Sequence, residues 1–175
     1  MNRWVRPPVW CAVLLLAALP PAGLAQAPTP AHPQVWTGTV VHVGDGDTVY
    51  VKAADAPAAV AVRLLGMDAP EICQEGGAQA RQALAEMVLH HRVTVVGEGR
   101  DSYGRDLARV YAQGRDVGRQ MVALGHAWSL RHGRASAADY GEEQQQAQAA
   151  RRGLFAQAHP ELPRDFRQRH GSCKE

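Results

Sequence analysis

Charged side chains gather in one short stretch of the sequence, between an apolar segment and a proline. Arg63, Asp68 and Glu71 lie within nine residues, in the segment Arg-Leu-Leu-Gly-Met-Asp-Ala-Pro-Glu. All three side chains are ionised at neutral pH, because reference pKa values are about 3.9 for Asp, about 4.3 for Glu and above 12 for Arg. Two neighbouring carboxylates repel each other unless a cation or an anionic ligand with its counter-ion joins them. The stretch therefore indicates a site that binds ions.

Two other turns carry charges of the same kind. Asp45-Gly46-Asp47-Thr48 precedes a strand pattern, and the segment 101–109 contains Tyr103-Gly104-Arg105. Each motif has a structural alternative: Asp-Gly is a strong hairpin signal, Pro70-Glu71 suits a helix start, and 101–105 suits a turn. An EF-hand loop is excluded, because Val49 and Ala56 stand where that loop needs ligands.

Hydrophobic periodicity predicts the elements that position these turns. Alternating apolar residues predict strands over 35–43, 48–52, 60–64, 92–96 and 107–111, and Val35, Thr37, Thr39, Val41 and Val43 share one side of the first strand. Helical periodicity predicts helices over 76–91, 117–125 and 136–152. A five-stranded barrel with a helix after its third strand is the OB-fold arrangement, an α+β barrel that binds oligonucleotides or oligosaccharides. Because each charged turn lies at a strand end, we expect all three to meet at one rim.

The ends of the chain differ in composition from this domain. Residues 1–25 are typical of a signal peptide, with a basic start and a short apolar run, and cleavage after Ala25 is favoured over cleavage after Ala27. A Pro/Ala-rich leader is expected over 26–34, the domain over 35–159, and an aperiodic tail over 160–175. We therefore expect a secreted or periplasmic protein without a membrane anchor after cleavage.

The cysteine content fits an exported protein, and the net charge provides no general attraction to nucleic acid. Loss of residues 1–25 lowers the Lys plus Arg count from 19 to 17, against 17 Asp plus Glu, so the mature net charge is about zero. Attraction to phosphate must then be local. Cys73 and Cys173 remain, either as free thiols or as the disulfide favoured in an exported protein. A bridge would close a loop of about 100 residues, worth up to ~4.7 kcal/mol in the chain-entropy model.

Together and in this order, the three motifs resemble those of the thermonuclease, or staphylococcal nuclease-like, family. The resemblance covers about residues 35–155 and implies an OB barrel with three helices. It also implies a Ca²⁺ site made by Asp47, Asp68 and the backbone carbonyl of Ala69, and assigns catalysis to Arg63, Glu71 and Arg105. The implied reaction breaks the bond between phosphorus and the 5′ oxygen in DNA and RNA and leaves 3′-phosphate ends.

Elementary chemistry agrees with these implied roles. Ca²⁺ takes about 6 to 8 oxygen ligands, so two carboxylates and a carbonyl leave room for water and a phosphate. Two arginines suit a phosphate that gains charge, and Glu71 is the candidate general base for water. Tyr103 and Trp128 are candidate substrate-binding aromatics that favour single strands, or else rim or core residues.

Two hypotheses follow from the sequence. The first is a monomeric, exported, Ca²⁺-dependent nuclease acting on DNA and RNA. The second is a non-catalytic OB-fold module that binds single-stranded nucleic acid. Asp47, Asp68 and Glu71 favour the first, because a binding module has no need of carboxylates that repel phosphate. A bridge between Cys73 and Cys173 would also hold the loop of Glu71, which adds a structural hypothesis.

Overall fold

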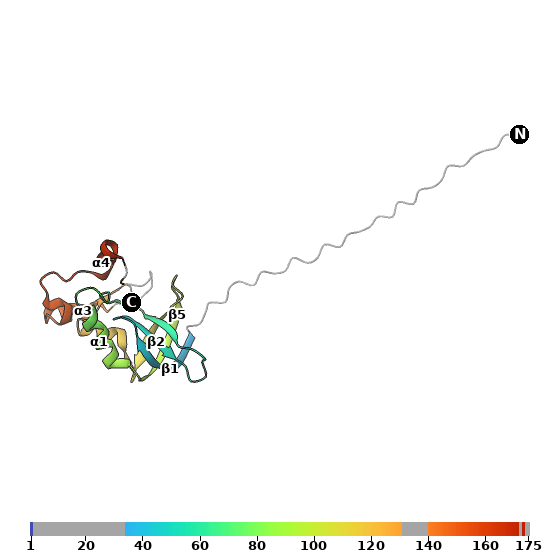
Figure 1. The fold of residues 1–175 in the computed structure, drawn as a ribbon, viewed down its shortest axis with the longest axis horizontal. Coiled ribbons are helices and arrows are strands. Elements are labelled where there is room, and N and C mark those ends of the chain that lie inside the picture. Colours follow the sequence, from blue (N-terminus) through green and yellow to red (C-terminus); the bar gives the residue numbers. More distant parts are fainter. Residues whose placement is uncertain (2–33, 131–139, 172, 174–175) are drawn as a thin grey trace. The chain divides into compact units, whose positions relative to one another are not determined.

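The structure is a computed structural model that describes residues 1, 34–130, 140–171 and 173 (Figure 1). Apart from Met1, the predicted signal peptide lies outside these residues, as does the predicted leader before Gln34. Among the helices of the described ranges, none has the length and hydrophobicity needed to cross a membrane.

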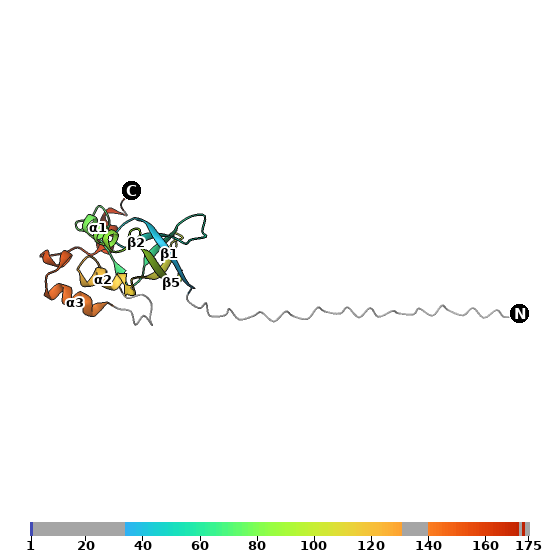
Figure 2. The same cartoon turned by 90° about the horizontal axis from the view of Figure 1, so that it is seen from below.

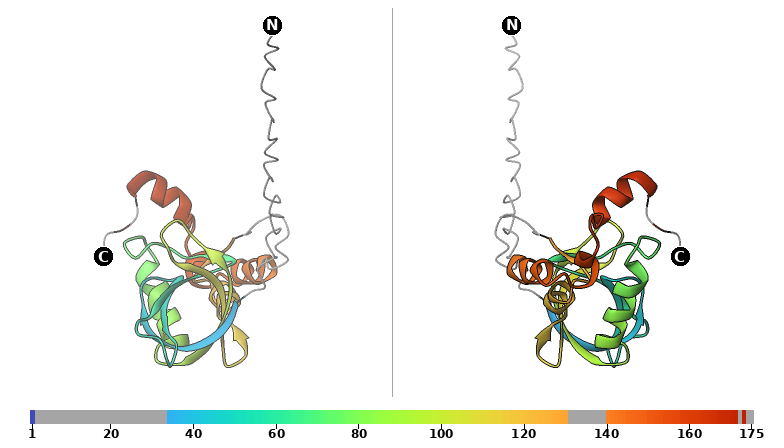
Figure 3. Two further views of the ribbon diagram at one scale, coloured as in Figure 1. Left: turned by 90° about the vertical axis from the view of Figure 1, so that its right-hand side faces the viewer. Right: turned by 90° about the vertical axis from the view of Figure 1, so that its left-hand side faces the viewer.

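Five strands form a closed barrel. They are β1 (Gln34–Val43), β2 (Thr48–Lys52), β3 (Val60–Leu64), β5 (Arg92–Arg100) and β6 (Asp106–Ala112). Neighbours pair in the order β3-β2-β1-β5-β6, and a parallel pairing of β3 with β6 closes the ring that Figure 3 shows end-on. Short strands add to it: β7 (Arg115–Asp116) pairs with β6, and β4 (Met67–Asp68) pairs with β8 (Trp128–Ser129). The five-stranded OB barrel predicted from the sequence is confirmed.

The first strand departs from simple alternation. A bulge between Val40 and His42 shifts its register against β2. Val40 and Val43 are therefore both buried, although their spacing is odd, while Val35 and Val41 are exposed. The prediction that Val41 and Val43 share one side is wrong for this reason, because a bulge inserts one extra residue and turns the following side chains to the opposite face. The strand can in this way pair with β5 along its first half and with β2 along its second.

Three helices gather on one side of the barrel, as Figures 1 and 2 show. They are α1 (Gly77–Val88), α2 (Val117–Ala123) and α3 (Gly141–Ala149), followed by a 3₁₀ turn, η1 (Gly153–Ala156). The apolar face predicted for the first helix is buried, with Ala80, Leu84 and Val88 in the main core. Residues 136–139 of the third predicted helix lie outside the described part of the chain. Helices α1 and α2 and the barrel interior thus share one hydrophobic core, whereas Ala147 of α3 belongs to a second, smaller cluster.

A fourth helix occupies the segment that we predicted to be an aperiodic tail. α4 spans Pro163–His170, with Pro163 in its first turn and Asp165 near its N-terminus. Arg167, Arg169 and His170 lie in its last turn, where positive charge is favourable. The prediction is wrong because this helix has no apolar stripe: its stability comes from end effects and from contacts with distant residues, neither of which leaves a periodic pattern.

Candidate active site

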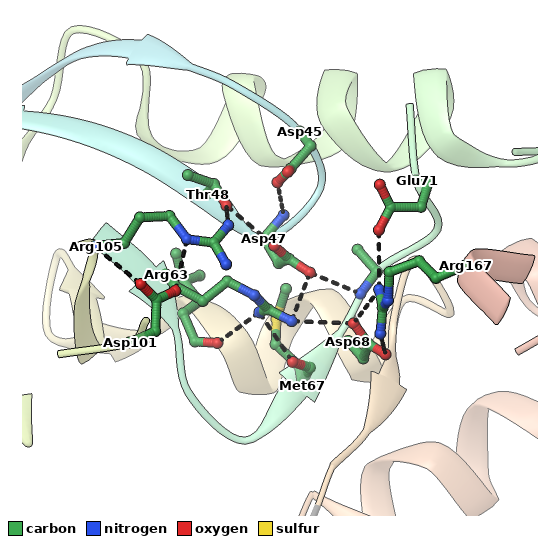
Figure 4. A network of polar contacts seen from close by, with 12 residues as sticks. Asp45, Asp47, Thr48, Arg63, Met67, Asp68, Glu71, Asp101, Arg105 and Arg167 are labelled. Carbon is green, nitrogen blue, oxygen red and sulfur yellow. Dashed lines mark hydrogen bonds and ion pairs between the residues drawn. The ribbon is translucent and has the colours of Figure 1, made fainter. Parts of the chain in front are cut away.

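The three charged motifs meet in one network of polar contacts, and the prediction that they lie together is confirmed (Figure 4). The backbone of the first motif bonds to the second, since the Leu64 amide donates to the Asp47 carbonyl at 2.8 Å. The Ala69 amide donates to Asp47 Oδ2 at 3.1 Å. From the third motif, Arg105 Nη1 donates to the hydroxyl of Thr48 at 3.2 Å. Segments up to 57 residues apart in the sequence therefore build one site.

Gly46 is required for a close approach between segments. A Cβ added to it would lie 2.6 Å from the Cβ of Ala69 and 2.7 Å from that of Ala80. Asp45 orders the same loop, because its Oδ1 accepts from the amide of Asp47 at 2.9 Å. The loop thus presses against both the second motif and helix α1, which fixes the position of the Asp47 carboxylate.

Arg63 lies at the centre of the cluster. Its Nη2 is 2.9 Å from Asp47 Oδ2 and donates to Asp68 Oδ1 at 3.0 Å. Its Nη1 donates to the carbonyls of Leu64 and Met67 at 2.9 and 3.1 Å. The same guanidinium therefore fixes the turn between β3 and β4 and offsets part of the charge of two carboxylates.

Asp47 and Asp68 fit a cation site. Burial, with the neighbouring charges of Asp45 and Asp68, raises the pKa of Asp47 to about 7 against the opposing effects of Arg63 and of the Ala69 amide. A buried carboxylate in such a field gains from a nearby cation. One nitrogen of Arg63 already contacts both carboxylates, so their oxygens converge on one point. No group of three or more Cys, His, Asp or Glu side chains within the described ranges makes a fuller ligand set, so ligands beyond the two carboxylates would be backbone carbonyl, water or substrate oxygens.

Arg105 is held by the turn of its own motif. Its Nε donates to Asp101 Oδ2 at 2.8 Å and its amide to Asp101 Oδ1 at 2.9 Å. Slight burial raises the pKa of Asp101, but these bonds and that from the Tyr103 amide outweigh it and hold the pKa below its usual value. Asp101 therefore remains charged and keeps the guanidinium oriented.

The two predicted aromatic contacts have different positions. Tyr103 is 82 % exposed and lies under the Arg105 guanidinium, whose carbon is 5.5 Å from the ring centre. Trp128 is 7 % exposed and packs edge-on against Phe155 in a second small core. The structure therefore brings Tyr103 to the site and places Trp128 in a core, which is the alternative that the sequence left open for it.

A cavity of about 630 Å³ opens beside these residues. Its walls carry both carboxylates and cations, together with the aromatic rings of Tyr50 and Tyr103. The charged lining residues are Asp45, Asp47, Arg63, Glu71, Arg105 and Arg167. Its volume and mixed charge suit a ligand that carries a phosphate, a sugar and a base.

Glu71 has a partner that the motifs did not reveal. Arg167, on helix α4, donates from Nη1 to Glu71 Oε1 at 2.9 Å. It also contacts both oxygens of Asp68, at 3.3 and 2.9 Å. The only sequence signal that pointed to this region was the cysteine pair, because Cys73 and Cys173 form a disulfide with Cα atoms 5.9 Å apart. The bridge joins the segment after Glu71 to the residues after α4.

Comparisons with known proteins point to the same family that the three motifs of the site resemble. The model of the family described as Staphylococcal nuclease homologue matches residues 61–157. The chain is 38% identical over 148 residues to "Protein ParB" of Escherichia coli, covering 79% of this chain and 82% of that protein. It is 35% identical over 140 residues to "Micrococcal nuclease" of Shigella flexneri, covering 74% and 79%, respectively. It is 34% identical over 131 residues to an "Uncharacterized endonuclease" of Haemophilus influenzae, covering 75% and 72%. The protein therefore belongs to the staphylococcal nuclease family.

Proposed function

We propose that this protein is an exported, Ca²⁺-dependent nuclease that hydrolyses phosphodiester bonds of DNA and RNA and leaves 3′-phosphate ends. The observation that carries the proposal is that Asp47, Glu71, Arg63 and Arg105 line one cavity, with Asp68 paired to Arg63 beside it. The names of the relatives, an endonuclease and a micrococcal nuclease, support the same reaction class.

The two arginines are suited to bind the phosphate. Arg105 lines the cavity, and its Nε is held by Asp101. Its remaining donors are therefore positioned for a phosphate oxygen. Arg63 pairs with Asp47 and Asp68, and a metal ion on those carboxylates would release its donors for the same phosphate. Both guanidinium groups would stabilise the negative charge that grows as phosphorus becomes five-coordinate.

Asp47 and Asp68 would hold Ca²⁺, with the Ala69 carbonyl completing the protein's share of the ligands. When bound there, the ion supplies positive charge that polarises a phosphoryl oxygen. Glu71 would accept a proton from the attacking water. The hydroxyl then bonds to phosphorus, the bond to the 5′ oxygen breaks, and that oxygen takes a proton from solvent, so the products are a 3′-phosphate and a 5′-hydroxyl.

The alternative, a non-catalytic OB-fold module for single-stranded nucleic acid, explains the exposed Tyr103 but not the acidic residues. In the absence of a cation, Asp47 and Glu71 in the cavity and Asp68 beside it would repel a phosphate backbone. The proposed nuclease uses all of them. We further propose that it acts as a monomer, favours single strands at the Tyr103 face, and reaches the periplasm or the medium.

The test is cleavage of single- and double-stranded DNA and of RNA, with CaCl₂ or with a calcium chelator. We expect chelator-sensitive cleavage whose products have 3′-phosphate ends by mass spectrometry. Glu71→Gln should lower turnover about 10²- to 10⁴-fold. Glu75→Gln is the matched control, because Glu75 is exposed and bonds only to Gln157 in the described contacts. Cleavage that persists in chelator, or a Glu71→Gln variant of full activity, would overturn this mechanism.

A further inference from the structure

A third arginine contacts the acidic residues of the site, and it comes from outside the three motifs. Arg167 Nη2 lies 2.9 Å from Asp68 Oδ2, and Nη1 lies 3.3 Å from Oδ1 of the same carboxylate. Nη1 also donates to Glu71 Oε1 at 2.9 Å. The guanidinium therefore bridges the proposed metal ligand and the proposed base, with its side chain 35% exposed (Figure 4).

The helix that carries Arg167 is fixed at both ends to the segment after Glu71. Before the helix, the carbonyl of Glu161 accepts from Gln74 Nε2 at 2.8 Å, and Gln74 Oε1 in turn accepts from the Glu71 amide at 3.2 Å. After the helix, Cys173 is bonded to Cys73. Because both attachments lie within three residues of Glu71, α4 is tethered where Arg167 meets the carboxylates.

Charge makes this contact compete with a metal ion. Both oxygens of Asp68 accept from Arg167, and Oδ1 accepts from Arg63 as well. A divalent cation on Asp68 would need these oxygens and would lie within a few ångströms of two guanidinium groups, where the repulsion between like charges is weakly screened. When a metal ion binds, Arg63 could contact the substrate phosphate in place of the carboxylates. Arg167, in contrast, is kept beside Asp68 because its helix is tethered.

We propose that Arg167 is an internal cation that competes with the metal ion for Asp68, and that the Cys73–Cys173 disulfide strengthens this competition by holding α4 in place. The inference rests on the proposed function, because it takes Asp68 as a metal ligand. Its consequence is that the affinity for Ca²⁺ is lower than the acidic residues alone would give. Reduction of the disulfide raises that affinity by letting the helix leave.

The test measures Ca²⁺ binding by calorimetry on the mature full chain without nucleic acid, so that activity plays no part. Arg167→Gln should bind Ca²⁺ about tenfold more tightly than the unchanged protein, a factor that corresponds to about 1.4 kcal/mol. Arg164→Gln is the matched control, since Arg164 is exposed on the same helix, and it should leave the affinity unchanged. Arg167→Lys keeps the charge but loses the two-nitrogen contact, and its affinity should be intermediate.

A second variant tests the role of the disulfide. Cys73→Ser with Cys173→Ser should also bind Ca²⁺ more tightly, and adding Arg167→Gln to it should give little further gain. Thermal unfolding without Ca²⁺ checks that each variant is folded. Equal or weaker Ca²⁺ binding by folded Arg167→Gln would overturn the inference and leave the nuclease proposal standing. Absence of Ca²⁺ binding by every variant would overturn both.

Discussion

Arg63 and Asp47 form an ion pair that solvent barely reaches: Nη2 lies 2.9 Å from Oδ2, and the two side chains are 15% and 8% exposed. The same nitrogen contacts Asp68, and Nη1 holds the carbonyls of the following turn. Arg63 therefore contributes to the folded structure as well as to the proposed binding of phosphate. Loss of one partner from such a pair leaves a charge that is costly to bury.

Arg63→Ala should consequently destabilise the metal-free protein by about 3 kcal/mol, in addition to abolishing most activity. Asp47 would then have lost its ion-pair partner, while Asp68 would keep only Arg167, so added Ca²⁺ should restore part of the lost stability. Chemical denaturation with CaCl₂ and with chelator measures both effects. If Arg63→Ala is as stable as the unchanged protein in chelator, the ion pair does not contribute as described.

Arg105 should behave differently, because its side chain is more exposed than that of Arg63, at 30% against 15%. Arg105→Gln should lower turnover about 10²- to 10³-fold, the usual effect of losing one charge-stabilising donor, with little change in melting temperature. Arg100→Gln is a control on the same hairpin: Arg100 pairs with Asp106 and is 70% exposed. Similar activity losses in both variants would show a general effect of positive charge, not a role for Arg105 at the phosphate.

Gly46 offers a prediction about packing beneath the site. Gly46→Ala should cost about 1 to 3 kcal/mol, because its Cβ would overlap Ala69 and Ala80. The displacement of Ala69 should also weaken Ca²⁺ binding, since Ala69 follows Asp68. Gly97→Ala serves as the comparison, because its Cβ would approach the nearest atom only to 3.5 Å. Denaturation and calorimetry on both variants check the effect, and equal stabilities would refute it.

The barrel and most of the site could be predicted because, at those residues, the local sequence signals agree with the tertiary structure. Turn residues such as Gly46 and Gly104 mark strand ends, and charged residues at those ends predicted that Asp47, Arg63 and Arg105 would meet. Alternation failed in β1, where the bulge after Val40 reverses the side facing the core. No local pattern encodes a bulge, because it depends on how one strand pairs with two neighbours.

Arg167 and Trp128 are two residues whose positions could not be predicted from the sequence. Arg167 lies 96 residues after Glu71, in a helix without an apolar stripe, so neither periodicity nor a motif connects it to the site. Trp128 lies opposite Asp68 in the pairing of β8 with β4. Its ring nevertheless packs on Phe155, because this pairing turns the Trp128 side chain inward. Both positions follow from tertiary contacts that single residues do not predict.

His126 predicts a pH dependence of stability that is separate from the active site. Burial lowers the pKa of this residue from its usual 6.5, only partly opposed by the charge of Glu86. The unfolded chain therefore binds a proton at His126 more readily than the folded protein does. As the pH drops through about 6.5, His126 lowers the free energy of unfolding, and this contribution becomes constant once the pH is below the pKa of His126 in the folded protein. His126→Gln, which cannot be protonated, should lose less stability between pH 7.5 and 5.5 than the unchanged protein. Calorimetric melting at the two pH values measures the difference, and identical losses in the two proteins would show that His126 makes no such contribution.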